Sequence, residues 1–269
     1  MLSLGRDGTT NVVGGTHAIK SATLSQVLIA PDASIASADD AIRAEAAQVL
    51  DIRGQVTSTA GAGIHVNQGD DASDWQISGS VTGRTGIDAE SATETITVAI
   101  SGQVTGTGGT AMVTGSGNDA VQLANSLVPS AASPQIDGDV FLGAGNDSFD
   151  MAILDPRLTF PSQTITIDGG SGVDMFNDDW FGHEDITVRV TAIDDGYRFE
   201  MSDKSGQTNW TLTADVLGFE AFQLGSGRSI TRPEDLAQFQ QPAPVPLPAS
   251  ALLLGAAVLG LDVGKRRAA

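Results

Sequence analysis

The chain has 269 residues, of which 41% are hydrophobic but only 5% are aromatic, and its formal net charge is −19. So acidic a chain argues against a nucleic-acid partner, and the lack of cysteine excludes disulfides and thiolate metal sites. The charge suits a soluble surface, a divalent cation partner, or both, and the length suits one extended body with appendages.

The first segment, residues 1–14, is polar. Arg6 is its only basic residue, and no apolar run follows it. A secretory signal has a basic start followed by about 7–15 apolar residues. Two interpretations stay open: the protein does not use this export route, or its true start lies upstream of Met1 and the chain is a fragment.

The second segment, residues 15–183, repeats a unit about 23 residues long. Aliphatic residues recur in three series, with gaps of 21 to 25 residues. The series are Ile19, Ile42, Ile64, Ile87, Met112 and Ile136; Ile29, Ile52, Ile77, Ile100 and Leu123; and Ile35, Val56, Val81, Val104 and Leu127. Such a period is typical of a solenoid, in which each repeat buries its apolar face against its neighbours.

Each repeat has the pattern of strands. Residues 96–100, Ile-Thr-Val-Ala-Ile, alternate as a half-buried strand does, and Gly, Thr, Ser, Asn and Asp separate such runs. Three short strands and three turns fit into about 23 residues at about 3.3 Å of rise per strand residue. We therefore predict an all-β fold, with a right-handed parallel β-helix over residues 15–183.

Three glycine-rich turns share a second pattern: Gly115–Val121, Gly143–Phe149 and Gly169–Phe176. They resemble the nonapeptides of RTX calcium-binding β-rolls, and the third fits the whole G-G-x-G-x-D-x-U-x pattern. RTX motifs follow one another every nine residues, whereas the aspartates here lie 28 and 27 residues apart. That spacing is close to one coil plus a small insertion, so we expect the three turns to stack on one corner of successive coils.

The RTX resemblance implies Ca²⁺ as a candidate ligand of these turns. Glycines permit the positive-φ turn, the carboxylate supplies charge, and Ca²⁺ takes six to eight oxygens, so two stacked turns are needed for one site. The candidate metal residues are Asp119, Asp147, Asp174, Gly143, Gly145, Gly170 and Gly172. The alternative is that Gly, Asn and Asp serve here as ordinary turn residues.

The third segment, residues 184–240, changes pattern. Two alternating runs, at residues 186–190 and 197–201, flank the turn Asp194-Asp195-Gly196, and a second turn at residues 203–206 precedes Trp210. This pattern predicts an antiparallel β-meander that caps the open end of the solenoid. Capping-box spacing at Thr231–Glu234 predicts a short helix after it.

The C-terminal part consists of a Pro-rich linker, residues 241–248, and an apolar tail, residues 249–269, that ends with a Lys-Arg-Arg cluster. The tail predicts a short apolar helix, although about 13 apolar residues are fewer than the roughly 20 of a membrane span. The linker and tail contain the sequence motif Val245-Pro246-Leu247-Pro248-Ala249. Together these features resemble the VPLPA-CTERM type of PEP-CTERM sorting signals.

That resemblance implies an exported bacterial protein whose tail enters the membrane and is processed by an exosortase-type protease. It also implies association with the cell envelope or extracellular matrix, with an extracellular polysaccharide as a candidate partner. Asp262, within the apolar run, departs from the family's usual uninterrupted segment.

The function that fits these patterns is structural or adhesive, at the cell surface, with calcium as a candidate stabiliser. The alternative is a polysaccharide-cleaving enzyme, a lyase or glycoside hydrolase, on the same scaffold. Its candidate residues are Asp70, Asp71, Asp178, Asp179, His183 and Arg189. Acidic pairs can hydrolyse glycosides when held at the right separation, but these pairs fit no catalytic motif, so we expect no enzyme.

Overall fold

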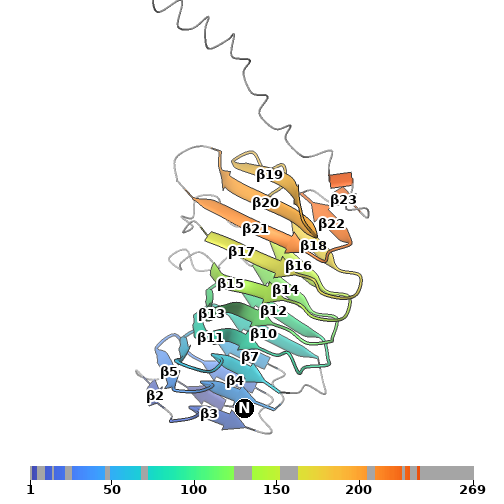
Figure 1. The fold of residues 1–269 in the computed structure, drawn as a ribbon. Coiled ribbons are helices and arrows are strands. Elements are labelled where there is room, and N and C mark those ends of the chain that lie inside the picture. The colour runs from blue at the N-terminus through green and yellow to red at the C-terminus, as the bar shows by residue number, and fades with distance from the viewer. Residues whose placement is uncertain are drawn as a thin grey trace, which may run out of the picture.

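A computed structural model describes residues 2–4, 10–13, 15–21, 26–45, 49–67, 72–123, 135–151, 163–204, 210–225, 228–230 and 235–236. Within these residues the fold is an all-β solenoid, in which parallel strands stack coil upon coil (Figure 1). Two sheets of 10 and 13 strands form its faces. The predicted parallel β-helix is confirmed.

The first sheet consists of β1 (Leu2–Leu4), β4 (Gln26–Ile29), β7 (Val49–Ile52), β10 (Ser73–Ile77), β12 (Ile96–Ile100), β14 (Ala120–Leu123), β16 (Ser148–Met151), β18 (Met175–Asp178), β22 (Ala221–Leu224) and β23 (Arg228–Ile230). The second consists of β2 (Thr10–Val13), β5 (Ala33–Ser37), β8 (Gln55–Ser58), β11 (Ser80–Asp88), β13 (Gln103–Val113), β15 (Gln135–Phe141), β17 (Gln163–Asp168), β21 (Thr211–Leu217), β20 (Gly196–Asp203) and β19 (Ile186–Ile193), and it also includes β3 (Ile19–Ser21), β6 (Ile42–Ala44) and β9 (Ile64–Val66).

The early coils have three strands each, and later coils have two. Strands β3, β6 and β9 form a column of their own, and the long β11 then pairs with both β8 and β9. The corner between the two columns thus becomes a bend inside one strand, at the register shift between Gly83 and Thr85. The first coil includes β1 and β2, which pair in parallel with β4 and β5, so residues before 15 also contribute strands.

The core consists of the predicted aliphatic columns. Every step of the second series, from Ile29 to Leu123, is a direct strand partnership, and all its members are buried. The first series is confirmed from Ile19 to Met112. Stacked aliphatic side chains on successive rungs exclude water along the whole axis, which is the main stabilising term.

The assignment of Ile136 to the first series is wrong. Met112 faces Val140, whereas Ile136 faces Val104 and so continues the third series. Leu127, predicted at that position, lies outside the described residues. The reason is a longer connection between β14 and β15, which delays the next coil and breaks the constant period.

The predicted meander is present as β19, β20 and β21, which pair antiparallel in sequence order. The solenoid nevertheless continues beyond it, because β21 pairs in parallel with β17 and β22 with β18. The meander therefore extends one sheet at the end of the stack. Large aromatic side chains fill this end, and Phe176 packs against Phe149, Phe199, Phe219 and Phe222 at centroid distances of 5.0–6.2 Å.

After β23 the structure describes a single 3₁₀ turn at residues 235–236, with Leu236 buried. The Pro-rich linker, the Val245–Ala249 motif and the apolar tail lie outside the described residues. In the described part of the chain, no helix is long and apolar enough to cross a membrane.

Candidate functional site: a ladder of buried carboxyls

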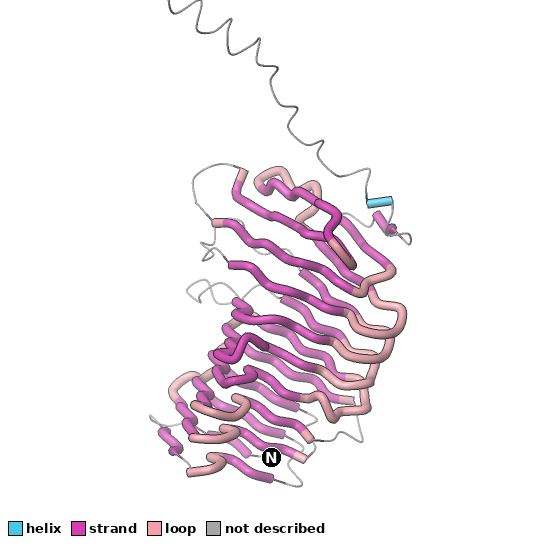
Figure 2. The backbone as a smooth tube through the Cα atoms, in the orientation of Figure 1, coloured by secondary structure: helices cyan, strands magenta, loops and turns pink. Residues whose placement is uncertain are grey.

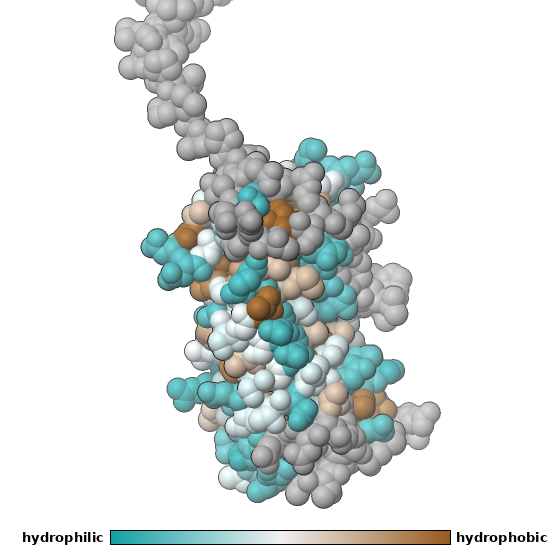
Figure 3. All heavy atoms as spheres, turned by 90° about the vertical axis from the view of Figure 1, so that its right-hand side faces the viewer, coloured by the Kyte–Doolittle hydropathy of each residue, from teal (hydrophilic) through white to brown (hydrophobic). Residues whose placement is uncertain are grey.

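The three glycine-rich turns stack on one corner of the solenoid, as predicted. The strands after them are in register, with Ala120 opposite Ser148 and Ser148 opposite Met175. In Figure 2 these connections lie above one another along one side of the stack. Figure 3 views that side, where pale and hydrophilic residues predominate and hydrophobic residues are isolated.

Glycine is required in these turns because the coils approach each other through the backbone. Gly143, Gly145, Gly170 and Gly172 all have positive φ. A Cβ on Gly170 or Gly172 would overlap the carbonyl oxygen of the glycine at the same place in the coil before, Gly143 or Gly145. The turns are therefore packed against one another without side chains between them.

The aspartates Asp119, Asp147 and Asp174 form what we call the aspartate ladder. Each uses its Oδ1 atom to accept a backbone N–H of the coil before it. Asp174 accepts from Asp147 at 2.7 Å, Asp147 accepts from Asp119 at 2.6 Å, and Asp119 accepts from Ile96 at 2.8 Å. At the far end, Glu220 Oε2 accepts the N–H of Asp174 at 2.8 Å.

The asparagines of the turns form a second column in the opposite sense. Asn118 Oδ1 accepts the N–H of Asn146 at 2.8 Å, and Asn146 Oδ1 accepts the N–H of Val173 at 3.0 Å, both in the following coil. Asn and Asp side chains thus accept hydrogen bonds from the backbone amides that have no strand partner in the turns. A buried amide without an acceptor would destabilise the fold.

The second carboxyl oxygen of each ladder aspartate is left without a hydrogen bond. The Oδ2 atoms of Asp119, Asp147 and Asp174 are buried and have no partner, and the residues are at most 2% exposed. Burial raises the pKa of all three carboxyls, and that of Asp147 to about 7, with a smaller contribution from the neighbouring ladder charges. An unpaired buried carboxylate therefore needs a proton or a cation.

One oxygen of each ladder aspartate is committed to an amide, and the Oδ2 atoms are the ones available as ligands. In the described part of the chain, no three His, Cys, Asp or Glu side chains form a group suited to a metal ion. Calcium binding, with the seven residues named for it, stays a prediction.

The residues considered for catalysis differ in their surroundings. Asp70 and Asp71 lie outside the described residues. Asp178 is fully buried, its Oδ1 accepts the N–H of Trp180 at 2.9 Å, and burial raises its pKa to about 7. Arg189 lies 3.7 Å from Glu200 on the neighbouring strand of the meander. His183 lines a surface hollow beside β19.

A polar network that the sequence patterns did not single out lies on the outer face of β6, β9 and β11. His65 Nδ1 is 3.4 Å from Asp40 Oδ2 and 3.8 Å from Asp88 Oδ2, and its Nε2 is 2.5 Å from Asn67 Oδ1. Arg43 donates to Asp40 at 3.2 Å. A signal existed, because Arg43, His65 and Asp88 each follow a member of the first isoleucine series and so share one outward column.

Comparison with known proteins adds no relative: no protein-family model, no curated protein and no solved structure matches this chain. Function must therefore be argued from the residues themselves.

Proposed function

We propose that this chain is an exported bacterial surface or matrix protein with a structural or adhesive role. The observation that carries the proposal is where the unusual carboxyls lie. The aspartate ladder is buried beneath the turns and caps backbone amides between coils, so its chemistry serves the stack. In an enzyme, perturbed titratable groups converge on a cleft instead.

The outer faces of the solenoid suit such a role. One outward column of the second sheet runs Ser34, Gln55, Ser80, Gln103 and Gln135, one residue per coil. Rungs in a sheet repeat about every 4.8 Å, so polar groups are presented at regular spacing along a stiff axis. The resemblance of residues 245–269 to a VPLPA-CTERM signal supplies the cell-surface location.

Cell fractionation tests the location. The full chain is compared with a chain in which Pro246 and Pro248 are replaced by alanine, and with a control in which Pro242 and Pro244 are replaced. With the intact motif, we expect the protein to reach the envelope or the medium in a shortened form. Only the variant with Pro246 and Pro248 replaced should lose this localisation and processing. A cytoplasmic, full-length protein in all three strains would contradict the proposal.

Calcium binding is the second part of the proposal. In it, Ca²⁺ replaces the protons on the Oδ2 atoms of the aspartate ladder. The supporting observation is the run of buried, unpaired oxygens at one corner. Differential scanning calorimetry of the full chain in millimolar CaCl₂, MgCl₂ or EDTA should show a higher Tm with calcium, since a ligand that binds only the folded state stabilises it. Equal Tm values in all three would end the calcium assignment while leaving the structural role intact.

A polysaccharide-cleaving enzyme is the alternative, and the His65 network favours it. A histidine between two carboxylates can act as a general acid or base, and the network is partly exposed, with 23% of the His65 side chain and 32% of the Asp88 side chain accessible. Reducing-end and unsaturated-product assays on a panel of soluble polysaccharides would detect such activity. Loss of it in H65A but not in H183A would assign it to this network.

A further inference from the structure

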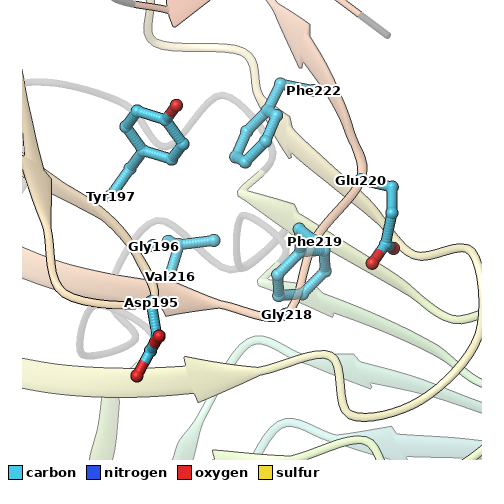
Figure 4. A pocket seen from close by; sticks show the side chains of 8 residues that line it. All are labelled: Asp195, Gly196, Tyr197, Val216, Gly218, Phe219, Glu220 and Phe222. Atoms are coloured by element: carbon cyan, nitrogen blue, oxygen red, sulfur yellow. The ribbon is translucent and has the colours of Figure 1, made fainter. Parts of the chain in front are cut away.

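A small hollow of about 280 Å³ lies where the meander meets the last coil, between β20, β21 and β22. Figure 4 shows its lining. The residues that border it are Asp195, Gly196, Tyr197, Val216, Gly218, Phe219, Glu220 and Phe222. Three of these eight are aromatic, in a chain that is only 5% aromatic.

The aromatic rings form the walls of the hollow. Tyr197 and Phe222 meet edge to face at a centroid distance of 5.6 Å, and Phe219 packs edge to face on Phe176 at 5.8 Å. Phe219 and Phe222 are buried and Tyr197 is half-buried, so the rings are held in place by the core behind them. Gly196 and Gly218 line the hollow with backbone alone.

The charge around the hollow has one sign. Asp195 and Glu220 are the charged residues of the lining, and none of the described residues that border the hollow is a lysine, arginine or histidine. In Figure 4 the two carboxylates lie on either side of Phe219. Glu220 is fixed by the N–H of Asp174, and Asp195 is held at a φ of 64°, the single positive φ of a non-glycine residue in the described part of the chain.

We propose that this hollow binds a small organic cation, such as a quaternary or primary ammonium with short apolar substituents. Aromatic rings attract a cation to their faces within about 6 Å, and the two carboxylates balance its charge. A volume near the lower end of ligand pockets, about 300 Å³, limits the ligand to a few heavy atoms beyond the ammonium. The net charge of −19 draws cations to the surface. The inference depends neither on export nor on calcium.

The test uses two probes of equal shape and different charge. Tetramethylammonium chloride and its neutral counterpart 2-methylpropan-2-ol, which has the same tetrahedron of five heavy atoms, are titrated into the ¹⁵N-labelled full chain, at constant ionic strength set with NaCl. We expect saturable shifts of the amides of Gly196, Gly218 and Phe219 with the cation, at concentrations on the order of 10 mM or below. The alcohol should leave them unchanged.

Isosteric variants locate the site. D195N and E220Q remove charge but keep the side-chain shape and, for Glu220, an oxygen that can accept the Asp174 amide. Each should weaken cation binding about fivefold to tenfold, and Y197L should do the same by removing a ring. D194N, in the same turn but outside the lining, is the matched control and should bind as the wild type does.

Two outcomes would overturn the proposal. One is the lack of saturable shifts with tetramethylammonium in the wild-type chain. The other is equal weakening by D194N and D195N, which would mean that only the general acidity of the surface is felt. Circular dichroism of each variant confirms that the fold is retained before binding is compared.

Discussion

Asp40 in the early coils and Asp147 in the later ones use the same device with different electrostatic consequences. Each carboxylate accepts a backbone N–H from an adjacent coil, from Ala62 at 2.9 Å and from Asp119 at 2.6 Å. The other oxygen of Asp40 faces Arg43 and His65, whereas that of Asp147 faces no partner.

The comparison shows that capping an amide and balancing a charge are separate requirements. The early coils meet both with side chains of the same outward column. The later coils meet only the first, and the pKa of Asp147, raised mainly by burial to about 7, is the result. We therefore expect the stability of this end of the solenoid to change with pH near neutrality.

The largest expected effect is that of pH. In the folded chain burial raises the pKa of Asp147 and of Asp178 to about 7, against about 3.9 in an unfolded chain. The folded state therefore binds more protons between about pH 4 and 7, so these two groups stabilise the fold fully below pH 4 and lose that contribution as pH rises through 7. Urea unfolding at several pH values should show that the free energy of unfolding of the wild type falls between about pH 4 and 7, and that it falls less in a D147N/D178N variant. Parallel slopes would mean that neither group is protonated in the folded chain.

The next effect is steric. In G172A the new Cβ would overlap the carbonyl oxygen of Gly145, at a φ of 151° that side chains rarely adopt, and we expect a loss of about 3 kcal/mol or more. G182A is the control, because Gly182 has a φ of 86° but open space around it. It should lose only about 1 kcal/mol from backbone strain. Equal losses in chemical denaturation would show that the coils can separate at the corner.

D147A should cost about 2 kcal/mol at neutral pH, because the buried N–H of Asp119 loses its acceptor. D147N keeps an oxygen in that place and should cost less. The pair separates the two requirements, since alanine removes both the cap and the charge while asparagine removes only the charge. If asparagine is as harmful as alanine in thermal denaturation, the charge itself contributes to stability.

The smallest effect is expected on the surface. Arg53 donates to Asp51 at 2.6–3.1 Å, but 55% of its side chain is exposed. Solvent screening limits such pairs to about 0.5 kcal/mol, so R53A should barely change the urea midpoint. A loss like that of D147A would mean that this pair orders the turn between β7 and β8.

Much of the fold could be predicted because its core is a one-dimensional pattern. The columns through Ile42 and Ile52 follow from spacing alone, since each coil places one aliphatic residue on each rung. The prediction was wrong at Ile136 because the connection before β15 is longer than in the coils that precede it. From spacing alone, such an insertion cannot be distinguished from the next repeat, and only the strand pairing shows which column Ile136 belongs to.

The candidate site was predictable in its residues and not in its chemistry. Stacking of Asp147 on Asp174 follows from their 27-residue spacing. In each ladder aspartate, Oδ1 accepts an amide hydrogen bond and Oδ2 stays unpaired. This arrangement depends on the direction of the side chain, which cannot be predicted from the spacing of the residues. The His65 network was missed for a similar reason: its members come from three coils, and only the pairs Asp40–Arg43 and His65–Asn67 are close in sequence.

The meander at the end of the stack bears on the order in which the protein folds. Its strands β19, β20 and β21 are neighbours in sequence and form hairpins, which close in about 1–10 μs, whereas every parallel rung joins residues more than 20 positions apart. The meander is therefore the part of the described chain that we expect to form fastest. We expect the hairpins to close before the parallel coils pair with them, because a short loop costs less entropy to close than a long one.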